Sequence, residues 1–297
     1  MNELKKCPIC NSNENIRMFA SANYNFSSID DYAFASRKIP EYMHYTLMEC
    51  TICKVLYAVD TLDQNELSLL YQKANFDSGR EANYASETYI YYLKKYKIDL
   101  SGTIMDIGTG EGSFLRCLIK EGAVSVVGIE PSIAPIEAAQ KDIKPFILNK
   151  IFIADEYQQE SFKVITCFQT LEHIPNPENI ISSINLLLEN KGVFYTVCHD
   201  YTSFANKLLG QKSPIYDIEH LQIFSRKSMK KLLHSTGFSK IILFTIWNSY
   251  PINYWLKLLP IPIAIKKILL DVLDKILVGR IRIPLNVGNF GAIAWKE

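Results

Sequence analysis

The sequence has 297 residues, 48% of them apolar, which is enough for one large domain, or a large and a small one, around a substantial core. Lysine and arginine number 32 against 31 aspartate and glutamate residues, so no net field favours nucleic acid or an anionic surface as partner. No apolar secretory stretch opens the chain and no uncharged apolar run is long enough to span a bilayer, which predicts a cytoplasmic protein without a transmembrane segment, with reduced cysteines.

Two Cys-x-x-Cys pairs come first in the chain. Cys7 and Cys10 form one pair, and Cys50 and Cys53 form the other, about forty residues later. This spacing lets two thiolates from each turn meet one tetrahedral Zn²⁺. Four sulfur ligands would leave the metal no open position, so we expect a structural zinc in a zinc-ribbon-like module over residues 1–60. The alternatives are metal-free thiol turns or, less favoured, a redox pair.

Strands and helices alternate after a helical lead-in over residues 61–100. Alternation predicts an α/β domain over residues 101–297 with a Rossmann-like, doubly wound, mostly parallel seven-stranded sheet. The predicted strands are 103–107, 124–129, a short one near residue 146, 162–168, 192–198, 241–246 and 290–295. The predicted helices are 113–120, 133–141, 177–188 and 228–234.

The first of these strands breaks into a glycine-rich turn that opens a helix. The strand ends near Asp106, and the turn contains Gly108, Gly110 and Gly112. Closely spaced glycines let backbone amides approach a ligand that a β-carbon would exclude. Glu130 ends the next strand, where a carboxylate can hold a ribose diol. The pattern predicts a nucleoside cofactor, although its glycine spacing departs from that of dinucleotide sites; the alternative is a turn that binds nothing.

Polar segments follow the later strands at the edge where ligands of an open α/β sheet bind. Residues 169–177 begin with Gln169 and contain His173, and residues 199–201 begin with His199. A third segment, residues 219–225, contains His220 and precedes a predicted helix. We therefore expect three histidines on the cofactor side of the sheet.

Residues 251–284 interrupt the alternation as an amphipathic helical insertion. Between residues 263 and 278 charged residues occupy one half of a helical wheel, and the other half holds Ile265, Leu269, Val272, Leu273 and Ile276. Such a face most often packs on its own domain or on a second copy of the chain, so a homodimer is one expectation. Membrane contact is less favoured, because the polar face is not rich in lysine and arginine.

Residues 61–297 resemble the class I S-adenosylmethionine-dependent methyltransferases. In that family the aspartate and the glycines surround the amino-acid end of the cofactor, and the acid after the second strand takes the ribose hydroxyls. The resemblance thus implies that Asp106, Gly108, Gly110, Gly112 and Glu130 bind S-adenosylmethionine, and Gln169 joins this predicted set.

Two further motifs narrow the resemblance. The Leu-Glu-His segment at residues 171–173 is similar to one in the small-molecule branch of the family. The segment from His220 to Ser225, ahead of a helix that ends in Gly-Phe, resembles polysaccharide- and sugar-modifying members. The cysteine module joined to this domain resembles bacterial enzymes of glycan and deoxysugar pathways. The implied acceptor is a small molecule, a sugar or glycan precursor, methylated on oxygen or carbon.

Catalysis of methyl transfer depends mainly on holding donor and acceptor in line. A base helps when the acceptor is a hydroxyl or an acidic C–H, and histidine suits this task near neutral pH. We rank His220 first and His199 second as the base; the alternative for either is a hydrogen-bonding residue that orients a loop.

Two other functions stay open. An NAD-dependent sugar oxidoreductase or epimerase is disfavoured because no Tyr-x-x-x-Lys pair follows the fourth strand. A non-catalytic binding protein of methyltransferase fold is disfavoured by the intact glycines and the neutral charge. Cofactor binding separates the three functions.

Overall fold

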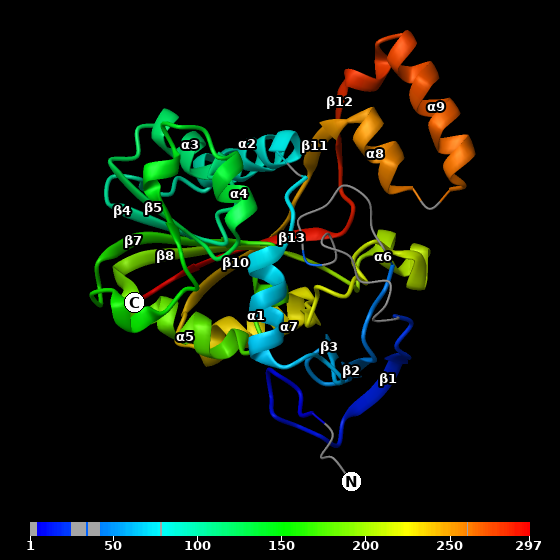
Figure 1. Ribbon diagram of the computed structural model, residues 1–297. Coiled ribbons are helices and arrows are strands. Elements are labelled where there is room, and N and C mark those ends of the chain that lie inside the picture. Colours follow the sequence, from blue (N-terminus) through cyan, green and yellow to red (C-terminus); the bar gives the residue numbers. More distant parts are fainter. Residues whose placement is uncertain (1–4, 25–33, 35–41, 78, 260) are drawn as a thin grey trace.

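The computed structural model describes residues 5–24, 34, 42–77, 79–259 and 261–297 (Figure 1). Its largest sheet comprises Thr103–Ile107 (β4), Ser125–Glu130 (β5), Ile147–Asn149 (β6), Phe162–Phe168 (β7), Leu188–His199 (β8), Lys240–Thr245 (β10) and Asn289–Trp295 (β13). The strand order is β10-β13-β8-β7-β4-β5-β6. Strands β4 to β8 pair in parallel, whereas β13 is antiparallel to both β8 and β10. The predicted doubly wound, mostly parallel seven-stranded sheet is confirmed.

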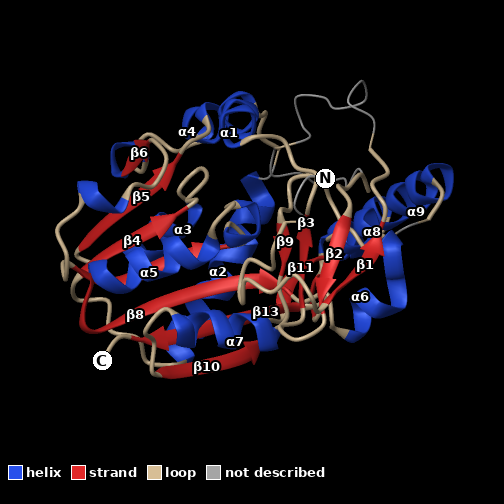
Figure 2. Cartoon of the chain, turned by 90° about the horizontal axis from the view of Figure 1, so that it is seen from below, coloured by secondary structure: helices blue, strands red, loops and turns tan. Residues whose placement is uncertain are grey.

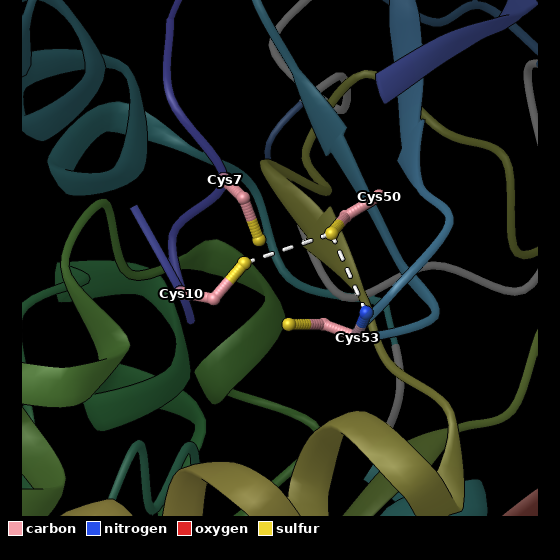
Figure 3. Close-up of side chains that lie close together, drawn as sticks. All are labelled: Cys7, Cys10, Cys50 and Cys53. Atoms are coloured by element: carbon pink, nitrogen blue, oxygen red, sulfur yellow. Dashed lines mark hydrogen bonds between the residues drawn. The ribbon is translucent and has the colours of Figure 1, made fainter. Parts of the chain in front are cut away.

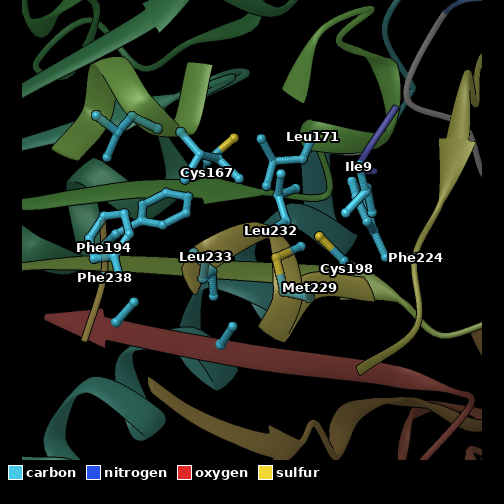
Figure 4. Packing of buried hydrophobic residues seen from close by; sticks show 14 of the residues in the cluster. Ile9, Cys167, Leu171, Phe194, Cys198, Phe224, Met229, Leu232, Leu233 and Phe238 are labelled. Carbon is cyan, nitrogen blue, oxygen red and sulfur yellow. The ribbon is translucent and has the colours of Figure 1, made fainter. Parts of the chain in front are cut away.

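Helices cover both faces of this sheet. They are Gly79–Lys95 (α2), Ser113–Lys120 (α3), Ile133–Ala138 (α4), Pro177–Leu187 (α5) and Arg226–Ser235 (α7). Two other helices, Gln64–Lys73 (α1) and Phe204–Leu209 (α6), lie outside this set, and Leu67 of α1 packs in a separate buried cluster with Leu47. On one face Leu93 of α2 and Leu118 of α3 share a buried cluster with Ile104. On the other face Leu232 of α7 packs in a cluster with Phe194 (Figure 4). The central strands are buried on both sides, which explains their continuous apolar runs.

Local signals fix where several elements begin and end. Ser225 caps α7: its hydroxyl accepts from the Ser228 amide at 3.1 Å, and the Ser228 hydroxyl accepts from the Ser225 amide at 2.7 Å. Strand β8 begins four residues before the predicted strand, because its first residues continue the pairing with β7 past an irregularity in the register. Single 3-10 turns occupy Lys144–Phe146, Ala154–Glu156, Leu171–His173, Gly210–Lys212 and Val278–Arg280.

The cysteine-bearing segment forms part of a second sheet. Its strands are Ile16–Ala20 (β1), Leu47–Cys50 (β2), Val55–Ala58 (β3) and Gln222–Ile223 (β9), and all neighbours pair antiparallel. Figure 2 shows β9 beside β3. Since β9 begins two residues after His220, strand pairing joins the cysteine module to the segment that carries this histidine.

The predicted insertion leaves the main sheet as an arm, defined here as residues 248–285. It contains Asn248–Pro251 (β11), Ile252–Leu258 (α8), Ile263–Lys275 (α9) and Arg282–Leu285 (β12). β11 and β12 pair antiparallel at its base, and the two helices stand away from the sheet (Figure 1). In the part of the chain that the structure describes, every helix is too short or too polar to cross a bilayer.

Candidate active site

The glycine-rich turn between β4 and α3 has three residues with left-handed backbone. The φ angles of Gly108, Gly110 and Gly112 are +77°, +57° and +74°. A β-carbon on Gly108 would lie 2.2 Å from Thr170 Oγ1, and one on Gly112 would lie 2.5 Å from Ile143 Cγ2. A β-carbon on Gly110 would meet no atom within 4 Å. Gly108 and Gly110 line the cavity described below, whereas Gly112 is absent from its wall and its small size is required by packing.

Two buried carboxylates flank this turn. Asp106 Oδ1 accepts a hydrogen bond from Thr166 Oγ1 at 2.6 Å. Burial and the neighbouring charge of Glu130 raise the pKa of Asp106 to about 7. Glu130 ends β5, and its Oε2 and Oε1 accept from the backbone amides of Gly110 and Ser132, both at 2.9 Å. Burial also raises the pKa of Glu130.

Gln169 lies directly after β7 and has the left-handed φ of +50°. Its amide donates to the Val197 carbonyl at 2.7 Å, and its carbonyl accepts from His173 Nε2 at 3.0 Å. These bonds anchor the backbone of Gln169 on β8 and on the following turn. The residue lines the same cavity as Gly110 and Glu130.

One cavity of about 770 Å³ joins the predicted cofactor residues to the predicted base. This volume lies within the range of small-molecule sites. Residues from the glycine-rich turn and from the tips of β4, β5 and β7 form one part of its wall. Elsewhere the wall contains the histidines His173, His199 and His220, and aromatic residues from α1, α2 and the arm, including Tyr71, Tyr89, Tyr250, Tyr254 and Trp255.

The three histidines form one group. The ring centroids of His173 and His220 are 4.9 Å apart, and those of His199 and His220 are 5.3 Å apart. His220 Nδ1 donates to the Ile215 carbonyl oxygen at 2.9 Å, which leaves Nε2 with its lone pair. Burial and the two neighbouring histidines lower the pKa of His220 well below 6.5. The ring is therefore a neutral acceptor of protons at neutral pH.

His199 has a similar arrangement. Its Nδ1 donates to Asn289 Oδ1 at 2.9 Å, so Nε2 is again the unprotonated nitrogen. Burial lowers the pKa of His199 to about 4. The backbone amide of His199 donates to the buried Glu172 carboxylate at 2.8 Å, which fixes the end of β8. Both predicted bases, His220 and His199, line the cavity.

His173, Glu219 and His220 offer atoms within 4.8 Å of one another that could hold a metal ion. Both ring nitrogens of His173 already have partners, however. Nε2 bonds the Gln169 carbonyl and Nδ1 lies 3.0 Å from the Tyr71 hydroxyl. Because a ligating histidine needs a free lone pair, this geometry favours a role for His173 in orienting the turn.

Several residues of the wall had no recognisable sequence motif. The rings of Tyr89 and Phe168 pack at a tilt of 32° with centroids 4.3 Å apart, and the ring centroids of Tyr250 and Tyr254 are 4.4 Å apart. In the sequence Tyr89 belongs to a helical periodicity, Phe168 ends a predicted strand, and Tyr250 and Tyr254 lie just before and within the insertion. Only the fold brings them to the cavity, so no local pattern could have identified them.

The predicted metal ligands Cys7, Cys10, Cys50 and Cys53 come together (Figure 3). Their Sγ atoms lie within 4.8 Å of one another, and Cys10 Sγ is 3.7 Å from Cys50 Sγ. Sulfur ligands about 2.3 Å from a tetrahedral zinc lie about 3.8 Å apart, so this set fits zinc. Lys231 of α7 donates to Cys53 Sγ at 3.4 Å, which would offset part of the negative charge of four thiolates. All four thiols are unbridged.

A family model described as a methyltransferase domain matches residues 76–242, more than half of the chain. Among curated proteins, a "Ubiquinone biosynthesis O-methyltransferase" from Pasteurella multocida is 31% identical over 137 residues, which cover 40% of this chain and 56% of that protein. A protein of the same name from Histophilus somni is 34% identical over 119 residues, covering 36% and 50%. The chain thus spans about half the length of the curated relatives it matches.

Two solved structures share the fold. A SAM-dependent methyltransferase from Thermotoga maritima has a TM-score of 0.50 and 17% identity, covering 73% of this chain and 91% of its own. The [4+2]-cyclase SpnF has a TM-score of 0.50 and 14% identity, covering 71% and 80%. Because one of these two structures is a cyclase, the similarity establishes the fold alone, and the reaction is inferred from the residues of the site.

Proposed function

Because this chain belongs to the methyltransferase-domain family, we propose that it transfers the methyl group of S-adenosylmethionine to a hydroxyl of a small molecule. One observation carries the proposal: the buried Glu130 carboxylate, the open side of Gly110 and the unprotonated Nε2 of His220 share a single cavity. A donor and an acceptor bound together in that cavity would be held next to each other, so that methyl transfer between them becomes effectively unimolecular.

The cofactor half of the cavity suits a nucleoside. Each carboxylate oxygen of Glu130 accepts a backbone N–H bond, and a carboxylate oxygen has room for a second donor such as a ribose hydroxyl. Gly110 presents an unobstructed backbone, where any side chain would enter the cavity. Asp106, Gly108 and Gln169 complete the set that would hold the amino-acid end. When bound, S-adenosylmethionine supplies the methyl group from a sulfonium centre.

The acceptor half suits removal of a hydroxyl proton. His220 Nε2 would take that proton, while the Ile215 carbonyl holds Nδ1–H and fixes the tautomer. His199 lies beside it with its own free Nε2 and would orient the acceptor. The curated relatives, named as O-methyltransferases, support oxygen as the acceptor atom rather than carbon.

The cavity wall also bears on the class of acceptor. The sequence motifs favour a sugar or glycan precursor, and the aromatic wall of Tyr89, Tyr250 and Tyr254 suits the apolar face of a sugar ring. The same wall suits a phenolic ring, and the name of the curated relatives points to quinone chemistry. We propose the sugar-type acceptor and treat the phenol as its competitor in the test.

The cysteine cluster is proposed as a structural zinc site. Its support is the four converging sulfur atoms and the ammonium group of Lys231 against them. The site would stabilise the packing of β2 and β3 against α7, since Cys50, Val55 and Met229 belong to one buried cluster. With four protein ligands it would have no open position for substrate.

The test begins with mass spectrometry of small molecules carried by the purified chain and with calorimetric titration of S-adenosylhomocysteine and NAD. Methyl transfer is then followed on nucleotide sugars, lipid-linked sugars and catechols. We expect S-adenosylhomocysteine to bind and a sugar hydroxyl to be methylated. The matched variants are His220→Gln and His234→Gln, the latter on the exposed side of α7. Binding of NAD alone, or of neither ligand, would refute methyl transfer; methylation of catechols only would refute the sugar acceptor.

A further inference from the structure

Helix α9 in the arm presents its apolar side to solvent. None of its residues is buried. The apolar side chains of Ile265, Ile268, Leu269 and Val272, and of Ile276 directly after the helix, are between 40% and 63% exposed. Their spacing places them within one stripe along the helix. The expectation that this face packs on its own domain is wrong, because the arm projects the helix away from the sheet (Figure 1).

The side of α9 that faces the rest of the arm is mixed, since its less exposed residues are Lys266, Leu270 and Leu273. Lys266 Nζ donates to the Lys257 carbonyl oxygen at 2.7 Å, and Asp274 Oδ1 accepts from Asn253 Nδ2 at 2.5 Å. Both partners belong to α8. The other charged residues of α9 (Lys267, Asp271, Asp274 and Lys275) are exposed, and so is the apolar stripe. A contiguous exposed apolar stripe indicates a covering surface outside this chain.

The charge of the arm distinguishes two candidates for the covering surface, a second copy of the chain and a lipid surface. Helix α9 alone has three basic and two acidic residues, which is why its polar face disfavours membrane contact in the sequence. The whole arm has six basic residues and two acidic ones, although the whole chain is close to neutral. The basic residues are Lys257, Lys266, Lys267, Lys275, Arg280 and Arg282, of which Arg282 is paired with Glu87. A second copy pairing through the same face by two-fold symmetry would bring the basic arms together and repel. An anionic lipid surface would attract them and accept the apolar stripe.

We propose that the arm docks on an anionic membrane surface, with the α9 stripe inserted among the lipids. The docked helix lies against α8, whose residues Tyr254, Trp255 and Leu258 line the cavity. The arm therefore connects the lipid surface to the acceptor half of the site. This docking does not depend on methyl transfer, so its test and the test of the proposed function can fail separately.

The experiment is sedimentation of the full chain with phosphatidylcholine vesicles, with and without about one third phosphatidylglycerol. The arm variant Ile268→Asp/Val272→Asp is compared with a control variant, Val124→Asp/Leu186→Asp, at two exposed apolar residues away from the arm. We expect binding to the anionic vesicles that weakens with salt, is reduced about tenfold or more in the arm variant and changes less than about twofold in the control. Unfolding midpoints and S-adenosylhomocysteine titration establish that both variants are folded.

Three results would overturn the proposal. The wild-type chain could fail to sediment with either vesicle, or both variants could lose binding equally. Light scattering could instead show a wild-type dimer that the arm variant dissociates, without vesicle binding, in which case a second copy covers the stripe.

Discussion

Substitution of alanine for single glycines should separate cofactor access from stability. Gly110, Gly112 and Gly122 all have positive φ, at +57°, +74° and +90°. A β-carbon in this left-handed region costs about 1–2 kcal/mol at each position. Gly122 follows α3, and a β-carbon there meets no atom within 4 Å, so Gly122→Ala measures the backbone cost alone.

Gly110→Ala and Gly112→Ala should then have different effects, one on cofactor affinity and the other on stability. A β-carbon on Gly112 lies 2.5 Å from Ile143 Cγ2 and 3.0 Å from Ile147 Cδ1, and such overpacking adds about 1–3 kcal/mol to the loss of stability. A β-carbon on Gly110 adds no such contact but enters the cavity. We expect Gly110→Ala to unfold like Gly122→Ala yet bind S-adenosylhomocysteine about tenfold or more weakly, a change of about 1.4 kcal/mol.

The assays are urea unfolding of the free protein and calorimetric titration of the folded variants. Gly112→Ala should have the lowest free energy of unfolding of the three and an affinity close to that of the wild type while folded. If Gly110→Ala binds with wild-type affinity, or if Gly112→Ala loses affinity without losing stability, the assignment of Gly110 to the cofactor wall and of Gly112 to packing is wrong.

Three further predictions concern the carboxylate, the histidines and the metal. Glu130→Ala should weaken S-adenosylhomocysteine binding by about 1–3 kcal/mol in calorimetry, and unchanged affinity would exclude Glu130 as a ligand. His220→Ala should lower kcat by roughly 10²–10⁴-fold with unchanged cofactor affinity, and His199→Ala should lower it less; near-normal turnover of His220→Ala would move the role to His199. Since the pKa of His220 is lowered from 6.5, the wild-type rate should fall only when acidification protonates the ring, below the near-neutral range of free histidine, which a pH profile of kcat checks. Elemental analysis should find one zinc per chain, lost in Cys50→Ser; a metal-free wild type would contradict the zinc site.

The sheet could be predicted from the sequence because its signals are local. Each central strand is a continuous apolar run, and the glycine-rich turn has to follow the strand that it ends. Most of the predicted strands and helices therefore lie within a few residues of the observed ones. The candidates for cofactor binding could be identified for the same reason, since Asp106 and Glu130 lie at the ends of predicted strands and Gly110 lies in the turn after one of them.

Other features depend on contacts between distant segments. The pairing of β9 with β3 leaves no trace in either strand, each of which is short. The sequence of α9 gives the two sides of the helix but not which side faces solvent. The tautomer and lowered pKa of His220 require the Ile215 carbonyl and two other histidines, so an unperturbed histidine was the wrong basis for its pH dependence.

The pairing of β3 with β9 also bears on how the chain folds. Leu56 and Ile223 are partners in the register, although most of the main sheet lies between them in the sequence. Contacts between such distant positions carry a high loop-closure entropy and form slowly. During synthesis the edge of β3 has no partner until residue 223 leaves the ribosome. The amino-terminal sheet, although translated first, is thus completed only after the strands from β4 to β8 have been made.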